Sequence, residues 1–183
     1  MQKEDFKDGS GVIKDNKEKL DYTIRELIYF TLKESDNTAY IKLVEYVTKE
    51  KIIEFGKSLG ALHTLEGKDL FGIVSSFDMM IYLEALYKYF QTETILSKEL
   101  KKWMINPSYE IIDSQNVNYK EFVKKYGSFG IAYHEVGIVY DDNPYILIIL
   151  TQKNEKEEQV KKKYINVVAK KILKIHKILG KIK

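Results

Sequence analysis

Cysteine is absent from this sequence of 183 residues, which also holds only two prolines and three histidines. Without cysteine the chain can form neither a disulfide framework nor a zinc–thiolate site, and it has no thiolate nucleophile. The histidines His63, His134 and His176 stand far apart in sequence, and none has a visible partner. We therefore expect no metal site and no cofactor.

Long apolar runs are also absent. The longest strongly apolar run, Tyr145 to Leu150, is much shorter than the roughly 20 residues that a membrane-spanning helix needs. Met1 is followed by the polar residues Gln-Lys-Glu-Asp and not by the apolar core of a secretory signal peptide. We expect neither a membrane span nor a signal peptide in this chain.

The chain has no large excess of either charge, because 30 basic and 27 acidic residues leave a net charge of only +3. The basic surplus lies at the end of the chain, where residues 152–183 hold eleven lysines and three glutamates. A lysine-rich helix usually has a solvated basic face, although it can also bind a polyanion or a membrane surface. We favour the solvated face, expect no nucleic-acid partner, and keep polyanion binding as an alternative.

The length suffices for one well-packed domain, and 44% of the residues are hydrophobic. We therefore expect a single domain over residues 1–183. Residues 1–21 form a polar lead-in with few apolar side chains, so they are not a self-sufficient start to a fold.

The helix signals are clear in the first half of the chain. Thr23 with Glu26 is a capping box that predicts a helix over about 23–33. Helices are also predicted from Asn37 or Thr38 to about residue 47, and from a Thr48 cap to residue 59, where Gly60 adopts the left-handed conformation.

The next segments combine a loop with two further helices. Residues 61–72 have mixed polarity and two glycines, which predicts a loop. Ser75 with Asp78 forms another capping box, opening a helix to about residue 90 whose apolar stripe is typical of core packing. Ser97 is predicted to cap a short helix through Trp103.

The pattern changes to a strand period after residue 125. Residues 126–140 alternate in polarity, residues 141–144 form a turn, and residues 145–150 are continuously apolar, which predicts an antiparallel hairpin at the centre of a sheet. His134 and Glu135 are neighbours on a strand, so they should point to opposite faces. A helix over 157–181 is predicted to cover the sheet, with one buried face. That face comprises Ile165, Val168, Ala169, Ile172, Ile175 and Leu179. These elements indicate an α+β domain with one antiparallel sheet covered by helices.

Ser35-Asp36-Asn37 stands at the junction of two predicted helices. All three residue types are also favoured helix caps, so the tripeptide alone is weak evidence. Its surroundings, Tyr22-Thr-Ile-Arg-Glu-Leu27 and Glu34-Ser-Asp-Asn-Thr-Ala39, resemble the segment around the Ser-Asp-Asn motif of class A β-lactamases and penicillin-binding proteins.

The resemblance extends from Gly9 to the end of the chain. Lys125-Tyr126-Gly127 falls where these families have Lys-Thr-Gly, at the start of a strand. Three further stretches are similar to the family's next helix, the start of the helix after its active-site loop, and its hairpin. They are residues 53–60, 74–76, and 133–139 with 144–151.

The resemblance implies a role for each matching residue. Ser35 would relay a proton to the leaving nitrogen, and Asn37 would hold the amide side chain of the substrate. Lys125 would supply positive charge beside the substrate carboxylate. Tyr126, Gly127 and Ser128 would contact the substrate along the strand, and a backbone N–H near Ser128 would belong to the oxyanion hole.

Three departures from the family pattern bear on activity. No serine in the sequence is followed by lysine three residues on, so the Ser-x-x-Lys segment with the nucleophile is absent. Residues 61–72 contain no Glu-x-x-Leu-Asn, and only Glu66 and Asp69 are carboxylates there. Tyr126 replaces the threonine or serine of Lys-Thr-Gly, which removes a small hydroxyl from the carboxylate anchor.

The leading hypothesis is a β-lactamase/transpeptidase-like fold, truncated at the N-terminus and inactive as this chain. The resemblance implies a bacterial hydrolase outside the cytoplasm, a β-lactam or peptidoglycan-peptide substrate, and a link to antibiotic resistance. The alternative is a noncatalytic binding or scaffold domain derived from that family. The oligomeric state stays open.

Overall fold

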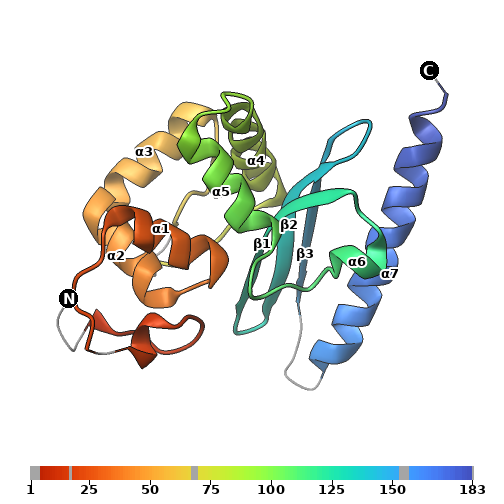
Figure 1. Ribbon diagram of the computed structural model, residues 1–183. Helices are drawn as coiled ribbons and strands as arrows, with labels where there is room; N and C mark the ends of the chain where they lie inside the picture. Colours follow the sequence, from red (N-terminus) through yellow and green to blue (C-terminus); the bar gives the residue numbers. More distant parts are fainter. Residues whose placement is uncertain (1–4, 17, 67–69, 153–156, 183) are drawn as a thin grey trace. The chain divides into compact units, whose positions relative to one another are not determined.

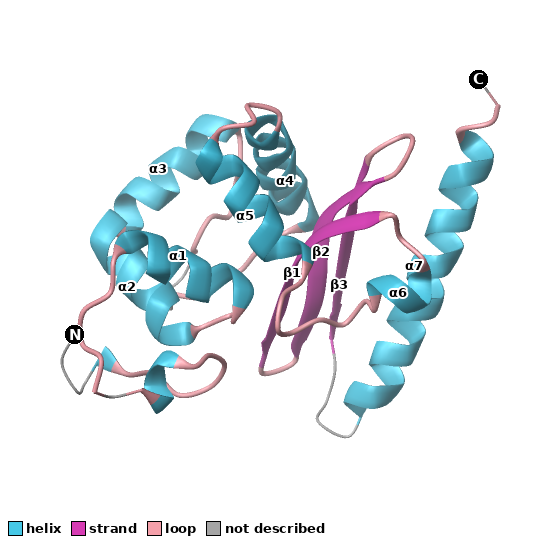
Figure 2. Cartoon of the chain, in the orientation of Figure 1, coloured by secondary structure: helices cyan, strands magenta, loops and turns pink. Residues whose placement is uncertain are grey.

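The computed structural model describes residues 5–16, 18–66, 70–152 and 157–182. The chain folds into two compact units, Met1–Tyr109 and Glu110–Lys183 (Figure 1). The first unit is helical, and the second contains the sheet (Figure 2).

The helices of the first unit follow one another with short connections. After a 3-10 turn, η2, they are numbered α1 to α5 in chain order. Their bounds are η2 (Ile13–Asp15), α1 (Ile24–Lys33), α2 (Asn37–Val47), α3 (Lys49–Leu59), α4 (Ser76–Phe90) and α5 (Ile95–Ile105). The helices predicted from the sequence are confirmed to within a few residues at each end.

The predicted caps begin and end these helices, with one exception. Thr23 and Ser75 each form the expected capping box at α1 and α4, and Gly60 closes α3 in the left-handed conformation with a φ of 95°. The predicted Ser97 cap is wrong. Thr94 caps α5 by accepting a hydrogen bond from the Ser97 N–H, so the helix begins at Ile95 and Ser97 lies in its first turn.

The polar lead-in contributes to the core of the first unit. Ile13 is only 1% exposed and packs with Leu27 of α1 and Ala39 of α2. The lead-in has few apolar side chains, so the burial of Ile13 between these two helices anchors the segment to the first unit.

The second unit consists of a short helix, three antiparallel strands and a long helix. The elements are α6 (Ser114–Val117), β1 (Glu121–Phe129), β2 (Ala132–Tyr140), β3 (Tyr145–Gln152) and α7 (Glu158–Leu179). The order β1-β2-β3 places β2 at the centre of the described sheet. The predicted hairpin is present as β2 and β3, but its first arm was predicted over residues 126–140, whereas residues 126–129 end β1 and β2 begins at Ala132. The sequence analysis predicted neither α6 nor the start of β1 at Glu121.

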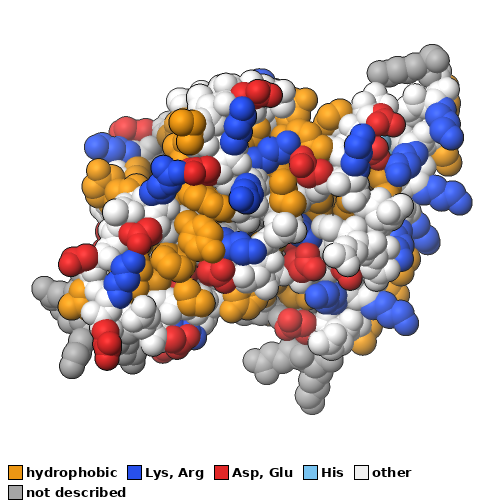
Figure 3. Space-filling model, viewed as in Figure 1, with side chains coloured by type: hydrophobic (Ala, Val, Ile, Leu, Met, Phe, Trp, Pro, Cys, Tyr) orange, Lys and Arg blue, Asp and Glu red, His pale blue; other side chains and the backbone are white. Residues whose placement is uncertain are grey.

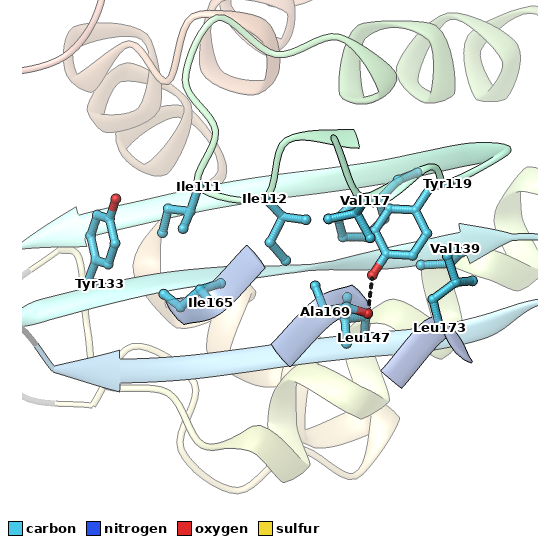
Figure 4. Packing of buried hydrophobic residues seen from close by; sticks show 11 residues of the cluster. Ile111, Ile112, Val117, Tyr119, Tyr133, Val139, Leu147, Ile165, Ala169 and Leu173 are labelled. Carbon is cyan, nitrogen blue, oxygen red and sulfur yellow. Dashed lines mark hydrogen bonds between the residues drawn. The ribbon is translucent and has the colours of Figure 1, made fainter. Parts of the chain in front are cut away.

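One face of the sheet packs against α7 (Figure 4). Side chains on a strand point alternately to its two faces, and one face of each strand contributes to the cluster with α7. The strand residues in this cluster are Phe122, Tyr133, Val139 and Leu147. The rest of the cluster comes from the segment before β1 and from α7. Its buried members are Ile111, Ile112, Val117, Tyr119, Ile165, Ala169 and Leu173.

The predicted buried face of α7 is only partly correct. Ile165 and Ala169 are buried and Ile172 packs against the cluster, but Val168, Ile175 and Leu179 are exposed. Leu173 is buried instead. The error arises because α7 is apolar on two sides, so periodicity alone does not show which side faces the sheet. In Figure 3, lysine side chains gather over α7 with apolar side chains between them.

Candidate active site

Ser35 stands between α1 and α2 in a conformation that serine rarely adopts. Its φ is 49°, in the left-handed region, where a side chain costs about 1–2 kcal/mol relative to glycine. The Asp36 N–H donates to Phe30 O at 3.1 Å and so closes the end of α1. Backbone strain at a serine in a turn between helices is typical of functional positions.

Asp36 is the structural centre of the tripeptide. Its carboxylate is 1% exposed and accepts three backbone hydrogen bonds, from Val12 N at 2.7 Å, Ile13 N at 2.8 Å and Ala39 N at 2.9 Å. The last bond makes Asp36 the N-cap of α2. Capping therefore occupies Asp36 rather than Ser35, which is held in its turn by this fully bonded neighbour.

Asn37 contacts the polar lead-in. Its side-chain amide donates to Asp8 O at 2.8 Å, and its backbone N–H donates to Ser10 O at 3.1 Å. A Cβ atom at Gly9 would lie 2.5 Å from Asn37 Nδ2, so glycine is required for this close approach. The structure thus gives Asn37 a structural contact, and its predicted contact with a substrate stays a prediction.

The loop after α3 is fastened to the helices around it. The buried Asp78 carboxylate accepts from Leu62 N at 2.6 Å and from Ser75 Oγ at 2.7 Å. The Leu62 hydrogen bond is the main reason that the pKa of Asp78 is lowered. At the other end of the loop, the Tyr40 hydroxyl donates to Leu70 O at 2.6 Å.

The loop over residues 61–72 holds two carboxylates, Glu66 and Asp69. Glu66 lies at 3.0 Å from His63 Nδ1, and both side chains are about half exposed. Asp69 lies outside the described residues. The contact of Glu66 with an exposed histidine is an ordinary surface pair.

Lys125 lies in the middle of β1, not at its start as predicted. Its side chain is half-buried, and Nζ donates to Tyr126 O at 3.1 Å. Burial lowers the pKa of Lys125 to about 8, and the charge of Glu135 acts in the opposite direction. A lysine with a lowered pKa is common at functional sites, and the predicted contact of Lys125 with a substrate carboxylate stays a prediction.

The next residues of β1 point alternately to the two faces of the sheet. Tyr126 packs against the α7-side core, with its ring edge-on to Tyr133 at a centroid distance of 6.3 Å. No described atom lies within 4 Å of the position that a Cβ at Gly127 would take. Ser128 follows, opposite Tyr133 in the strand register. The strand is therefore open beside Gly127, while the Tyr126 ring belongs to the core.

Two buried charged residues were missed by sequence reasoning. Lys124 and Glu135 are both fully buried, on neighbouring strands. The signal was present for Lys124, because it alternates with Phe122 and Tyr126 and must share their face. The predicted opposition of His134 and Glu135 agrees with their contacts: Glu135 accepts from Ile111 N, while His134 Nδ1 accepts from Thr151 N at 2.9 Å.

Ser35 and Asn37 lie in the first unit, whereas Lys125, Tyr126, Gly127 and Ser128 lie in the second. Among the described residues, no cluster of three or more histidine, aspartate or glutamate side chains is suited to a metal ion. No helix in the described part of the chain combines the length and apolar character needed to cross a membrane.

The model of the β-lactamase enzyme family matches residues 1–176, and the chain belongs to this family. No curated protein sequence matches the chain.

Solved structures show the same fold at low sequence identity. The β-lactamase from Sphaerobacter thermophilus DSM 20745 is 20% identical with a TM-score of 0.71, over 83% of this chain and 63% of that protein. An ancestral class A β-lactamase (GNCA) is 16% identical with a TM-score of 0.79, over 96% and 74%. PBP-A is 16% identical with a TM-score of 0.72, over 93% and 69%. The predicted β-lactamase/transpeptidase-like α+β fold is confirmed, and the chain spans 63–74% of the length of these three proteins.

Proposed function

We propose that this chain supplies the proton-relay and carboxylate-binding parts of a β-lactam or D-alanyl peptide acyl-transfer site. The observation that carries the proposal is Ser35, held in a strained left-handed turn by the fully hydrogen-bonded Asp36. Strain of this kind is retained only where the surrounding contacts fix it, as they do here.

The chemistry of the site follows from the bonds that must change. In acyl transfer a nucleophile oxygen bonds to the carbonyl carbon, the carbon–nitrogen bond breaks, and a proton must reach the leaving nitrogen. Ser35 would carry this proton through its hydroxyl. Because no Ser-x-x-Lys occurs in the sequence, the nucleophile itself is not supplied by this chain.

Lys125 and the open strand beside Gly127 would bind the substrate. The lysine ammonium attracts the carboxylate, and its lowered pKa of about 8 still leaves it mostly charged at neutral pH. β1 is an edge strand of the described sheet. An extended acyl group can hydrogen-bond to such an edge.

The chain alone should be catalytically inactive, and a noncatalytic binding domain is the second candidate. Tyr126 favours this second candidate, because its ring lies in the core where the family would offer a small hydroxyl to the substrate. In either case the ligand would be a β-lactam or a peptidoglycan peptide, and the protein would act outside the bacterial cytoplasm.

The proposal is tested by amide chemical shifts during titration with benzylpenicillin. We expect shifts at Gly127 and Ser128, and loss of most of the binding in Lys125→Met because the carboxylate loses its partner. Lys163→Met, at an exposed position on α7, is the matched control and should bind like the unchanged chain. Unchanged binding in Lys125→Met, or no shifts near Gly127 in the unchanged chain, would refute the proposed substrate site.

A further inference from the structure

A buried carboxylate in the second unit holds the segment that precedes the sheet. Glu135 on β2 is 0% exposed, and its Oε2 accepts from the backbone N–H of Ile111 at 3.1 Å and from that of Ile112. Its other oxygen, Oε1, is buried without a hydrogen-bond partner among the described residues. A carboxyl group that is only half satisfied in the core favours its neutral form.

A buried ammonium on the adjacent strand holds the same segment. Lys124 Nζ donates to Ile112 O at 2.6 Å and to Ser114 Oγ at 2.9 Å, and it forms an ion pair with Glu110. Lys124 and Glu135 thus attach to the two sides of residues 110–114, one through N–H groups and the other through oxygen atoms.

We propose that Glu135 and Lys124 form a clamp that holds residues 110–114 against the sheet, and that the clamp opens more easily once Glu135 is ionised. The inference concerns the second unit alone and does not depend on β-lactam binding. It assigns a structural and regulatory role to two buried ionisable residues, Lys124 and Glu135, that the acyl-transfer proposal does not use.

The direction of the pH dependence follows from the burial of Glu135. Burial raises its pKa to about 7 from an ordinary value of 4.5, while the charge of Lys124 and the two backbone N–H groups act against this rise and Glu110 adds to it. The clamp is therefore fully stable below about pH 4.5, and its stability falls as the pH rises through about 7.

The other groups around the clamp do not reverse this direction. Tyr133 has a pKa raised by burial to about 12, and burial also raises that of Tyr119, so both stay neutral in this range. Lys125 on β1 titrates near pH 8 and interacts with Glu135 through its charge. From α7, Lys162 Nζ donates to Glu110 O at 3.1 Å and Asn166 Nδ2 donates to Ile111 O at 2.8 Å.

Hydrogen exchange of the Ile111 and Ile112 amides tests the clamp in the full chain. After correction for the intrinsic exchange rate, protection should fall by up to about tenfold per pH unit between about pH 4.5 and pH 7 and should level off above pH 7. Glu135→Gln cannot ionise and should remove most of this slope. Glu157→Gln, an exposed position before α7, is the control and should keep it. The same slope in the unchanged chain and in Glu135→Gln would overturn the proposal.

A second measurement needs no variant. The carboxyl carbon of Glu135, followed by NMR in the unchanged chain, should titrate with a midpoint near 7, since burial disfavours its charged form. A midpoint near the ordinary value of 4.5 would overturn the proposal even if Glu135→Gln failed to fold. A failure of penicillin binding would leave both results unaffected.

Discussion

At the scale of single residues, the three residues of Ser35-Asp36-Asn37 have different structural roles. Asp36 uses its carboxylate for three backbone hydrogen bonds, and Asn37 uses its amide for Asp8 O. Ser35 lies between them at a φ of 49°. The sequence showed that these residue types suit helix caps, but it did not show which of the three is the cap, because that depends on the path of residues 8–13.

Ser35 offers a direct measure of stored strain. Because glycine adopts the left-handed conformation freely, Ser35→Gly should be more stable to urea than Ser35→Ala by about 1 kcal/mol. Both variants remove the hydroxyl, so each serves as the other's control for side-chain loss. An alanine variant as stable as the glycine variant would show that the turn relaxes without cost.

At the scale of elements, local signals were sufficient in the first unit and insufficient in the second. Capping boxes at Thr23 and Ser75 depend on residues three apart, so the sequence revealed them. The early start of β1 depends on pairing of Glu121 with Tyr140, nineteen positions away in sequence. Long-range pairing of this kind leaves little trace in the local pattern.

The buried side of the lysine-rich helix α7 could not be predicted from the local sequence pattern either. Its sequence is apolar on two sides, and only packing against Leu147 and Phe122 shows which side is buried. The exposed side includes Val160, Tyr164, Val167, Val168, Ile175, Ile178 and Leu179. The solvated basic face that the sequence predicted is therefore accompanied by an exposed apolar one.

The two apolar sides of α7 should differ in energy. Leu173→Ala removes a side chain that is 6% exposed and should lower the free energy of unfolding by about 2–4 kcal/mol, as buried leucines do. Ile175→Ala changes a side chain that is 56% exposed and should stay within about 0.5 kcal/mol of the unchanged chain. Urea unfolding followed by circular dichroism compares them, and equal losses would mean that the outer side is also packed.

At the scale of the whole molecule, the family match and the solved structures show the family and the fold. The role in acyl transfer is a proposal based on Ser35 and Lys125. The motifs Ser35-Asp36-Asn37 and Lys125-Tyr126-Gly127 sufficed to predict the family from the sequence. Physical reasoning on the sequence missed the clamp of Lys124 and Glu135, because buried charges become visible only once their partners at residues 110–114 are located.

The central claim is that this chain carries the relay and binding parts of the site without the nucleophile. Incubation of the full 183-residue chain with benzylpenicillin, followed by intact-mass analysis, tests it most directly. The account predicts no covalent adduct, because no serine in the sequence has the lysine partner that activates it. A mass increase equal to one penicillin that peptide mapping places on a serine would contradict the claim and would show that this serine is the nucleophile, whereas an adduct on a lysine amine would not.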